Sequence, residues 1–323
     1  MSLLTMLKSV QAELLNFKAT TGSVLLGKAV GEKEKEQKKV LKNSSSWAII
    51  TGPTNGIGKE FAIELSKAGF NLFLIGRNLE KLTESPRRAL NERKEEESVS
   101  GPVEEQTKGK NGRRSDEIKT DLNPINLSIL INNAGLSHSE PIEFQMNDLD
   151  EDINSILNVN VFSVLYLTKL VIPFMLPHKK GLILNVASFS ALIPTPLLST
   201  YAGSKGFLYT WSQALGTELE PKGIDVKLLN TYFVASEMSK IKKATFLIPT
   251  PNNYVKQVLN NLISTNSKPF ITTGYFSHSL LEWFLDHYGS LKFWLKFNLN
   301  MQRSILKRIQ KKKERIAKQN QQS

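Results

Sequence analysis

The chain of 323 residues contains no cysteine, which excludes disulfide bonds, thiolate catalysis and metal sites with cysteine ligands. It has only four histidines, and no two of them have the spacing of a helical metal motif such as H-E-x-x-H. A metal site is therefore not expected. No uninterrupted apolar stretch reaches the roughly 18 residues that a membrane-spanning helix needs, so no spanning helix is expected either.

The positive charge is unevenly distributed. The formal net charge is +12, and much of the excess lies near the C-terminus, where only Glu314 opposes the basic residues Arg303, Lys307, Arg308, Lys311, Lys312, Lys313, Arg315 and Lys318. Such a tail is more often a solvated or membrane-surface segment than a reader of nucleic acid. No nucleic-acid recognition module accompanies it, so nucleic acid is not an expected partner.

Short apolar segments alternate with helical patterns along the middle of the chain. The predicted strands are residues 47–52, 71–76, 127–133, 181–188 and 225–230. Residues 56–68 place Ile57, Phe61, Leu65 and Ala68 on one face of a helix. This alternation indicates βαβ units, and therefore an α/β protein with a doubly wound parallel sheet of the Rossmann type.

Composition divides the chain into three parts. Residues 1–45 form an amphipathic and charged extension, residues 46–268 the catalytic domain, and residues 269–323 an aromatic and basic extension. Within the domain, residues 84–119 contain few hydrophobic side chains among many charges, which predicts a disordered or poorly packed insertion. The last extension suits either a helix in a membrane interface or a lid over the substrate cleft.

The sequence T-G-P-T-N-G-I-G follows the first predicted strand and opens the first helix. Glycines there permit a tight turn and let the backbone approach a pyrophosphate at the helix N-terminus. The candidate cofactor-binding residues are Gly52, Thr54, Asn55, Gly56, Ile57 and Gly58. Arg77 ends the next strand, where an arginine can pair with a 2′-phosphate, and this favours NADP(H) over NAD(H).

The segment Y-A-G-S-K places Tyr201 and Lys205 four residues apart, hence on one face of a helix. A phenol is a poor acid or base at neutral pH unless its anion is stabilised, and a neighbouring ammonium group supplies that stabilisation. Ser188 ends a predicted strand, where its hydroxyl can hydrogen-bond a substrate oxygen as charge develops. These three residues are the candidate catalytic centre.

Taken in order, T-G-P-T-N-G-I-G, N-N-A-G, N-V-N-V, Ser188 and Y-A-G-S-K resemble the short-chain dehydrogenases/reductases. The resemblance implies that Tyr201 donates the proton, that Lys205 supports it and contacts the cofactor ribose, and that Ser188 anchors the carbonyl. It further implies proton-relay support from Asn160. It also adds cofactor contacts at Asn133, Val234, Ser236 and Asp121.

Further segments, such as I-P-T-P-L-L-S-T-Y and T-Y-F-V-A-S-E-M-S-K-I, are similar to the microsomal very-long-chain 3-oxoacyl-CoA reductases. This resemblance implies NADPH-dependent reduction of a long-chain acyl-CoA at the endoplasmic reticulum membrane, with other elongation enzymes as possible partners. Two alternatives remain open. One is a steroid or retinoid dehydrogenase with the same centre, and the other is a catalytically impaired relative that acts as a binding subunit.

The sequence departs from these families in two places. Their members carry an N-terminal spanning helix, which is not expected here. They also carry a strand with an adenine-contacting aspartate and then a helix ahead of N-N-A-G, whereas here only residues 123–126 separate the candidate strand end, Asp121–Leu122, from the next strand. One βα unit is therefore expected to be truncated or replaced, which weakens adenine binding and the edge of the sheet.

Overall fold

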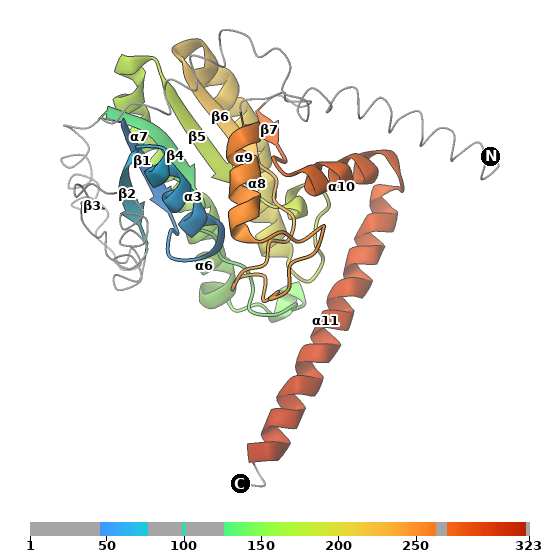
Figure 1. Cartoon of the computed structure of the whole chain (residues 1–323). Coiled ribbons are helices and arrows are strands. Elements are labelled where there is room, and N and C mark those ends of the chain that lie inside the picture. The colour runs from blue at the N-terminus through green and yellow to red at the C-terminus, as the bar shows by residue number, and fades with distance from the viewer. Residues whose placement is uncertain (1–45, 77–98, 101–125, 263–269, 321–323) are drawn as a thin grey trace.

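The computed structural model describes residues 46–76, 99–100, 126–262 and 270–320. Its centre is a seven-stranded sheet in the order β3-β2-β1-β4-β5-β6-β7, in which every neighbouring pair is parallel (Figure 1). The strands are β1 (Ser46–Thr51), β2 (Asn71–Ile75), β3 (Val99–Ser100), β4 (Asn126–Asn132), β5 (Gly181–Val186), β6 (Ile224–Leu229) and β7 (Ile271–Thr272). The predicted doubly wound parallel sheet is confirmed.

Helices cover both faces of the sheet because its strands are apolar on both sides. Helices α3 (Gly56–Lys67) and α9 (Pro251–Asn261) lie side by side over one face (Figure 1). Helices α7 (Ser163–Met175) and α8 (Ser199–Leu219) cover the other. Successive residues of β1 alternate accordingly, since Ile49 packs toward α7 and α8, while Ala48 and Ile50 pack toward α3 and α9.

A continuous helical stretch, Leu149–His178, precedes β5. It comprises η2 (Leu149–Asn154), α6 (Ser155–Leu157), η3 (Asn158–Phe162), α7 and η4 (Leu176–His178). By length and composition alone this stretch could cross a membrane, which differs from the expectation that no such helix exists. Its place in the fold accounts for part of its apolar character, because Val171 and Met175 are buried against the sheet.

The strand beside β2 lies earlier in the chain than expected. The structure places β3 at Val99–Ser100, parallel to Leu72 and Phe73, inside the segment predicted to be disordered or poorly packed. The predicted remnant of this strand, Asp121–Leu122, lies outside the described residues, as does the rest of 84–119. For those parts the expectation stays a prediction.

The C-terminal part first completes the sheet and then leaves it. Strand β7 pairs with β6 beyond residue 268, the predicted end of the domain. Helix α10 (Phe276–His287) follows, and α11 (Leu291–Asn320) runs from it past the carboxyl ends of the strands and away from the body (Figure 1).

Candidate active site

The turn between β1 and α3 requires glycine, through backbone conformation at two positions and lack of space at a third. Gly52 and Gly56 have φ angles of +64° and +56°, a conformation that L-residues rarely adopt. A Cβ atom at Gly58 would lie 2.2 Å from the carbonyl oxygen of Gly52. The Asn55 side chain caps α3 by accepting a hydrogen bond from the amide of Gly56. Because the glycines of the turn carry no side chains, the backbone amides at the start of α3 stay accessible, as a site for a pyrophosphate requires.

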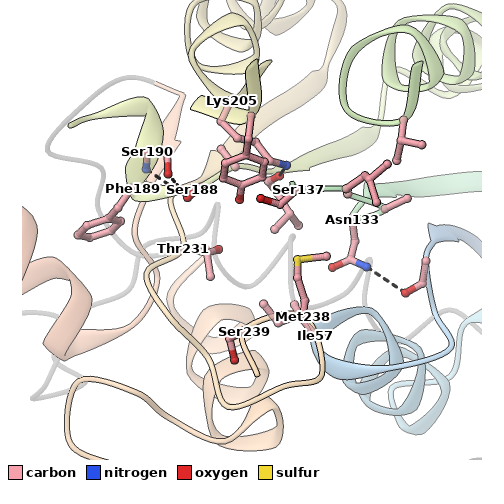
Figure 2. A pocket seen from close by; sticks show the side chains of 18 of the residues that line it. Ile57, Asn133, Ser137, Ser188, Phe189, Ser190, Lys205, Thr231, Met238 and Ser239 are labelled. Carbon is pink, nitrogen blue, oxygen red and sulfur yellow. Dashed lines mark hydrogen bonds between the residues drawn. The ribbon is translucent and has the colours of Figure 1, made fainter. Parts of the chain in front are cut away.

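Asn133 holds this turn against the end of β4. Its side-chain amide donates to the carbonyl oxygens of Thr51, at 3.0 Å, and Gly52, at 3.1 Å (Figure 2). In return the Thr51 hydroxyl accepts from the backbone amides of Asn133 and Ala134, both at 2.9 Å. Asn133 thus shapes the floor of the candidate cofactor site, where the sequence predicted a direct contact to the cofactor.

Tyr201, Lys205 and Ser188 meet at the carboxyl ends of the central strands. Lys205 is 4% exposed, and its ammonium group donates to the carbonyl oxygen of Val186 at 2.9 Å. Figure 2 shows Lys205 and Ser188 along one side of a pocket, with Ile57 and Met238 across from them. The structure therefore brings these three catalytic residues together in one cavity, whose lining does not include the fourth predicted catalytic residue, Asn160.

Burial controls the protonation of this centre. It lowers the pKa of Lys205 to about 8, so the side chain is still charged at neutral pH. It raises the pKa of Tyr201 above its ordinary value, and the hydrogen bond with Ser188 offsets part of that rise. The sequence predicted that Lys205 stabilises a phenolate, whereas in the structure desolvation dominates the pKa of Tyr201 and keeps it a neutral proton donor.

Asn160 lies in η3, a π-helical turn, and is fully buried. Its side chain accepts from the amide of Leu136 at 2.7 Å and donates to the carbonyl of Leu136 and the hydroxyl of Ser204. A Cβ atom at Gly135 would lie 3.6 Å from the ammonium of Lys205 and 3.7 Å from the amide oxygen of Asn160. Asn160 therefore holds in place the segment around Leu136 that passes beside Lys205. Its role in a proton relay stays a proposal.

A chain of hydroxyl groups behind Ser188 was missed by the sequence argument. The hydroxyl of Ser188 donates to that of Ser190 at 3.2 Å, and Ser190 in turn bonds the hydroxyl of Thr195 at 3.1 Å. The amide of Ser190 also donates to the Ser188 oxygen. The only sequence signal was the S-F-S spacing after β5. This network fixes the rotamer of Ser188.

The segment after β6 closes the cavity opposite the catalytic helix. Thr231, Tyr232, Val234 and Ser236 all line it, and the Thr231 hydroxyl bonds that of Tyr254 at 2.8 Å. A Cβ atom at Gly56 would lie 3.4 Å from the Cβ of Ser236. The structure thus puts the predicted Val234 and Ser236 across a narrow gap from the glycine turn.

His278 of α10 ties this segment to the C-terminal helices. It is fully buried, accepts a hydrogen bond from the amide of Tyr232 at 3.4 Å, and bonds the carbonyl of Leu247 at 3.1 Å. Burial lowers its pKa to about 4, so the ring is neutral at neutral pH. No motif in the sequence predicted this role.

The cavity has a volume of about 1870 Å³. Helices α10 and α11 form one wall, with Leu281, Phe284, Leu285, Trp294, Phe297, Asn298, Met301 and Gln302 facing it. The C-terminal extension was interpreted either as a membrane-interface helix or as a lid over the substrate cleft. Its position along the cavity wall agrees with the lid.

Two predicted site residues, Arg77 and Asp121, lie outside the described residues. Within the described ranges no three His, Asp or Glu side chains gather as a metal site would require.

A family model described as short chain dehydrogenase matches residues 46–245. The chain belongs to the short-chain dehydrogenase family. It is 40% identical over 254 residues to a very-long-chain 3-oxoacyl-CoA reductase of Mycosarcoma maydis, covering 74% of this chain and 68% of that one. It is 37% identical over 278 residues to the reductase of the same name from Laccaria bicolor, covering 84% and 81%.

Solved structures agree on the fold of this short-chain dehydrogenase. A 7beta-hydroxysteroid dehydrogenase superposes with a TM-score of 0.66 at 18% identity, covering 78% of this chain and 96% of that one. A short-chain dehydrogenase of Sphingobium yanoikuyae in complex with NADPH gives 0.58 at 22% identity, covering 70% and 87%. Likenesses at this level of identity establish the Rossmann architecture and no more.

Proposed function

We propose that this short-chain dehydrogenase reduces a 3-oxoacyl-CoA to the 3-hydroxyacyl-CoA with NADPH, in very-long-chain fatty-acid elongation. The observation that carries the proposal is the assembled Ser188, Tyr201 and Lys205 centre in a chain 37–40% identical to reductases of that name. An impaired relative acting as a binding subunit is the weaker alternative, because these three side chains all face one cavity.

The residues of the glycine turn fit a nicotinamide dinucleotide. Gly52 and Gly56 have left-handed backbone conformations and no side chains, so a ligand can approach the N-terminus of α3. Ser236 limits the space between the glycine turn and the segment after β6. Gly52, Thr54, Asn55, Gly56, Ile57 and Gly58 would hold the phosphates and ribose, and Asn133, Val234 and Ser236 the nicotinamide half. When bound, NADPH supplies the hydride for the reduction.

The chain's own groups would supply the proton and hold the substrate oxygen. Tyr201 is neutral because burial raises its pKa, so its hydroxyl can donate to the carbonyl oxygen as negative charge develops there. Ser188, fixed by Ser190, provides a second hydrogen bond to that oxygen. Lys205 remains charged at neutral pH and stabilises the tyrosinate left after proton transfer.

Preference for NADPH over NADH stays a prediction from the sequence, in which Arg77 follows β2 by two residues. A charge-assisted contact with the 2′-phosphate contributes roughly 1.5–3 kcal/mol. The Arg77→Asp variant should therefore reverse the preference. Equal affinities of the unmodified protein for both cofactors would remove Arg77 from the site.

We also propose that α10 and α11 rest on a membrane surface, as a reductase of lipid substrates at the endoplasmic reticulum would. Phe284, Phe293 and Phe297 are 42%, 55% and 53% exposed, and Lys292 and Lys296 lie among them. Exposed aromatic side chains with interspersed lysines suit the headgroup region. Phe284 and Phe297 also line the cavity, so a fatty acyl chain would enter from that side. Association with other elongation enzymes rests on resemblance alone.

Co-sedimentation with lipid vesicles tests the membrane proposal. The Phe293→Ser, Phe297→Ser double variant should lose most of the vesicle-bound fraction. Phe207→Ser provides the control, because Phe207 is 38% exposed on α8. Equal losses in both proteins would contradict a specific membrane-facing role for α11.

The enzymatic proposal is tested by following NADPH oxidation with a long-chain 3-oxoacyl-CoA and, in parallel, a ketosteroid. The acyl-CoA should be reduced with the higher kcat/KM. A preference for the steroid would favour the alternative hydroxysteroid activity. No turnover of either substrate, with normal NADPH binding, would favour the binding subunit.

A further inference from the structure

Helix α11 places on the cavity wall a polar side chain that bonds no other described residue. Gln302 is 4% exposed and lines the cavity, yet its amide has no hydrogen-bond partner among the described residues. Neighbouring cavity residues on the helix, Trp294 and Met301, are apolar. Because Gln302 lines the cavity and its amide bonds no other described residue, that amide can hydrogen-bond a polar group of a ligand there.

The position of Gln302 relative to the catalytic centre follows from its neighbour one turn earlier. Asn298 donates to the carbonyl of Pro194 at 3.3 Å, and Thr195 ends the hydroxyl chain that begins at Ser188. Residues four apart lie one above the other on a helix, so Gln302 lies one turn along α11 from this contact. A substrate extending out of the cavity along α11 would pass it.

A second anchor fixes the far part of the helix. Lys313 forms an ion pair of 2.8 Å with Glu140, in the loop that follows the cavity residue Ser137. The anchors at Asn298 and Lys313 are about 22 Å apart along a helix that rises 1.5 Å per residue. The two contacts therefore hold α11 along the edge of the cavity. A ligand that extends out of the cavity on this side would lie against the helix.

The face of α11 that lines the cavity becomes cationic beyond Gln302. Trp294, Met301, Arg308 and Arg315 follow one another at intervals of seven residues, close to two helical turns, and Lys312 lies one turn beyond Arg308. Arg308, Lys312 and Arg315 are exposed, and no acidic side chain among the described residues pairs with them. Along this face apolar residues thus give way to guanidinium and ammonium groups, and the amides of Asn298 and Gln302 lie beside it.

We infer that α11 binds the coenzyme A part of the substrate, with Gln302 at the amide-containing arm and Arg308, Lys312 and Arg315 at the phosphates. This inference rests on the proposed reduction of an acyl-CoA. The order of groups along the helix matches the order in such a thioester, from the reacting carbonyl outward. Guanidinium groups in particular suit phosphate, which they bind in bidentate fashion.

The chain offers a charge-matched control for the cationic face. Lys307, Lys311 and Lys318 also lie on α11, but they continue the face of Phe293, roughly a third of a turn around the helix from Met301 and Lys312. The test variant is Arg308→Gln, Lys312→Gln, Arg315→Gln, and the control is Lys307→Gln, Lys311→Gln, Lys318→Gln. Each removes the same charge from the same helix.

Both proteins are assayed in non-ionic detergent with a 3-oxoacyl-CoA and with the N-acetylcysteamine thioester of the same acid, which lacks the phosphates. The test variant should raise the KM for the CoA thioester by about tenfold with kcat nearly unchanged, as loss of several exposed ion pairs predicts. Its KM for the short thioester should not change, and the control variant should resemble the unmodified protein with both substrates.

For the amide, Gln302→Leu should raise the KM for both thioesters, because each keeps an amide group. The control is Gln310→Leu, an exposed glutamine on the same helix, which should leave both values unchanged. Equal KM values for Gln302→Leu and the unmodified protein would remove Gln302 from the substrate site.

Other outcomes separate the two proposals. If the test and control variants turned over both thioesters with the same KM for each, the CoA inference would be overturned and the proposed reductase activity would stand. Loss of binding to anionic vesicles by the test variant, without a change in KM, would assign its charges to lipid headgroups and overturn the inference too. Failure of the unmodified protein to reduce either thioester would overturn the proposed function and, with it, this inference.

Discussion

The ammonium group of Lys205 lies 5.9 Å from the centre of the Tyr201 ring, one turn farther along α8. It is held there by the carbonyl of Val186, at the end of β5. The strand, rather than another side chain of the helix, thus fixes the lysine beside the phenol. Both side chains are in place for proton transfer, and each has a separate role that a substitution can test.

Replacing Tyr201 with phenylalanine removes the proton donor and little else. Turnover should fall by roughly 10²–10⁴-fold, the usual contribution of a positioned acid, while the Kd for NADPH stays nearly unchanged. Steady-state rates and a fluorescence titration measure the two effects. Tyr209→Phe is the control, since Tyr209 lies on the same helix outside the cavity lining and should retain activity. Wild-type turnover in Tyr201→Phe would mean that another group is the acid.

Replacing Lys205 with methionine should abolish activity and yet stabilise the fold. The pKa of Lys205 falls from 10.5 to about 8 on folding, so the unfolded chain binds the proton more tightly. The charge therefore opposes folding increasingly as the pH falls from 10.5 to about 8, and in full below that value. Removing it should raise the free energy of unfolding at pH 7 by an amount on the order of 1–3 kcal/mol. Thermal unfolding at pH 7 measures the gain.

The same shift predicts how activity of the unmodified enzyme depends on pH. Lys205 loses its charge as the pH rises through about 8, so kcat/KM should decline above that value. A pH–rate profile that stays flat to pH 10 would show that the charge on Lys205 is not needed.

Replacing Gly58 with alanine tests the close approach of α3 to the β1 turn. The added Cβ would meet the Gly52 carbonyl at 2.2 Å and the Asn133 amide at 2.3 Å, so the backbone must shift. We expect a loss of roughly 1–3 kcal/mol in stability and weaker NADPH binding. Gly203→Ala is the control, because nothing lies within 4 Å of its added Cβ on α8. Similar melting temperatures for the two variants would contradict this account.

Local patterns in the sequence were enough to predict the core of the fold. Each apolar segment of five or more residues became a strand within two residues of its predicted ends, because a strand covered on both faces must be apolar throughout. The two-residue strands β3 and β7 carry no such pattern and depend on the neighbour with which they pair. The order of motifs likewise led to Ser188, Tyr201 and Lys205, which tertiary structure then brings together.

Residues whose role depends on distant contacts could not be predicted. Gln302 looks like any polar residue of a charged helix until α11 is placed over the cavity. His278 was one of four histidines without a motif, and its partners lie 46 and 31 residues away along the chain. Asn160 was correctly chosen as a site residue, but its contacts to Leu136 and Ser204 follow only from the packing of η3 against α8.

His278 should make the enzyme sensitive to mild acid. Its pKa falls from 6.5 to about 4 in the folded chain, because the ring is buried between Tyr232 and Leu247. The unfolded chain therefore takes up the proton first. The stabilising contribution of His278 is present above pH 6.5 and is lost progressively as the pH falls toward 4.

Between pH 7.5 and pH 5 this loss amounts to about 2 kcal/mol, which corresponds to a fall of several degrees in Tm for a protein of this size. The His278→Gln variant keeps groups that can donate and accept hydrogen bonds but cannot titrate. Its Tm should therefore fall less than that of the unmodified protein over the same interval, even if it begins lower. Scanning calorimetry at the two pH values measures the difference. Parallel falls in the two proteins would show that the acid sensitivity comes from other groups, and that the contact between α10 and the segment after β6 does not depend on a neutral ring.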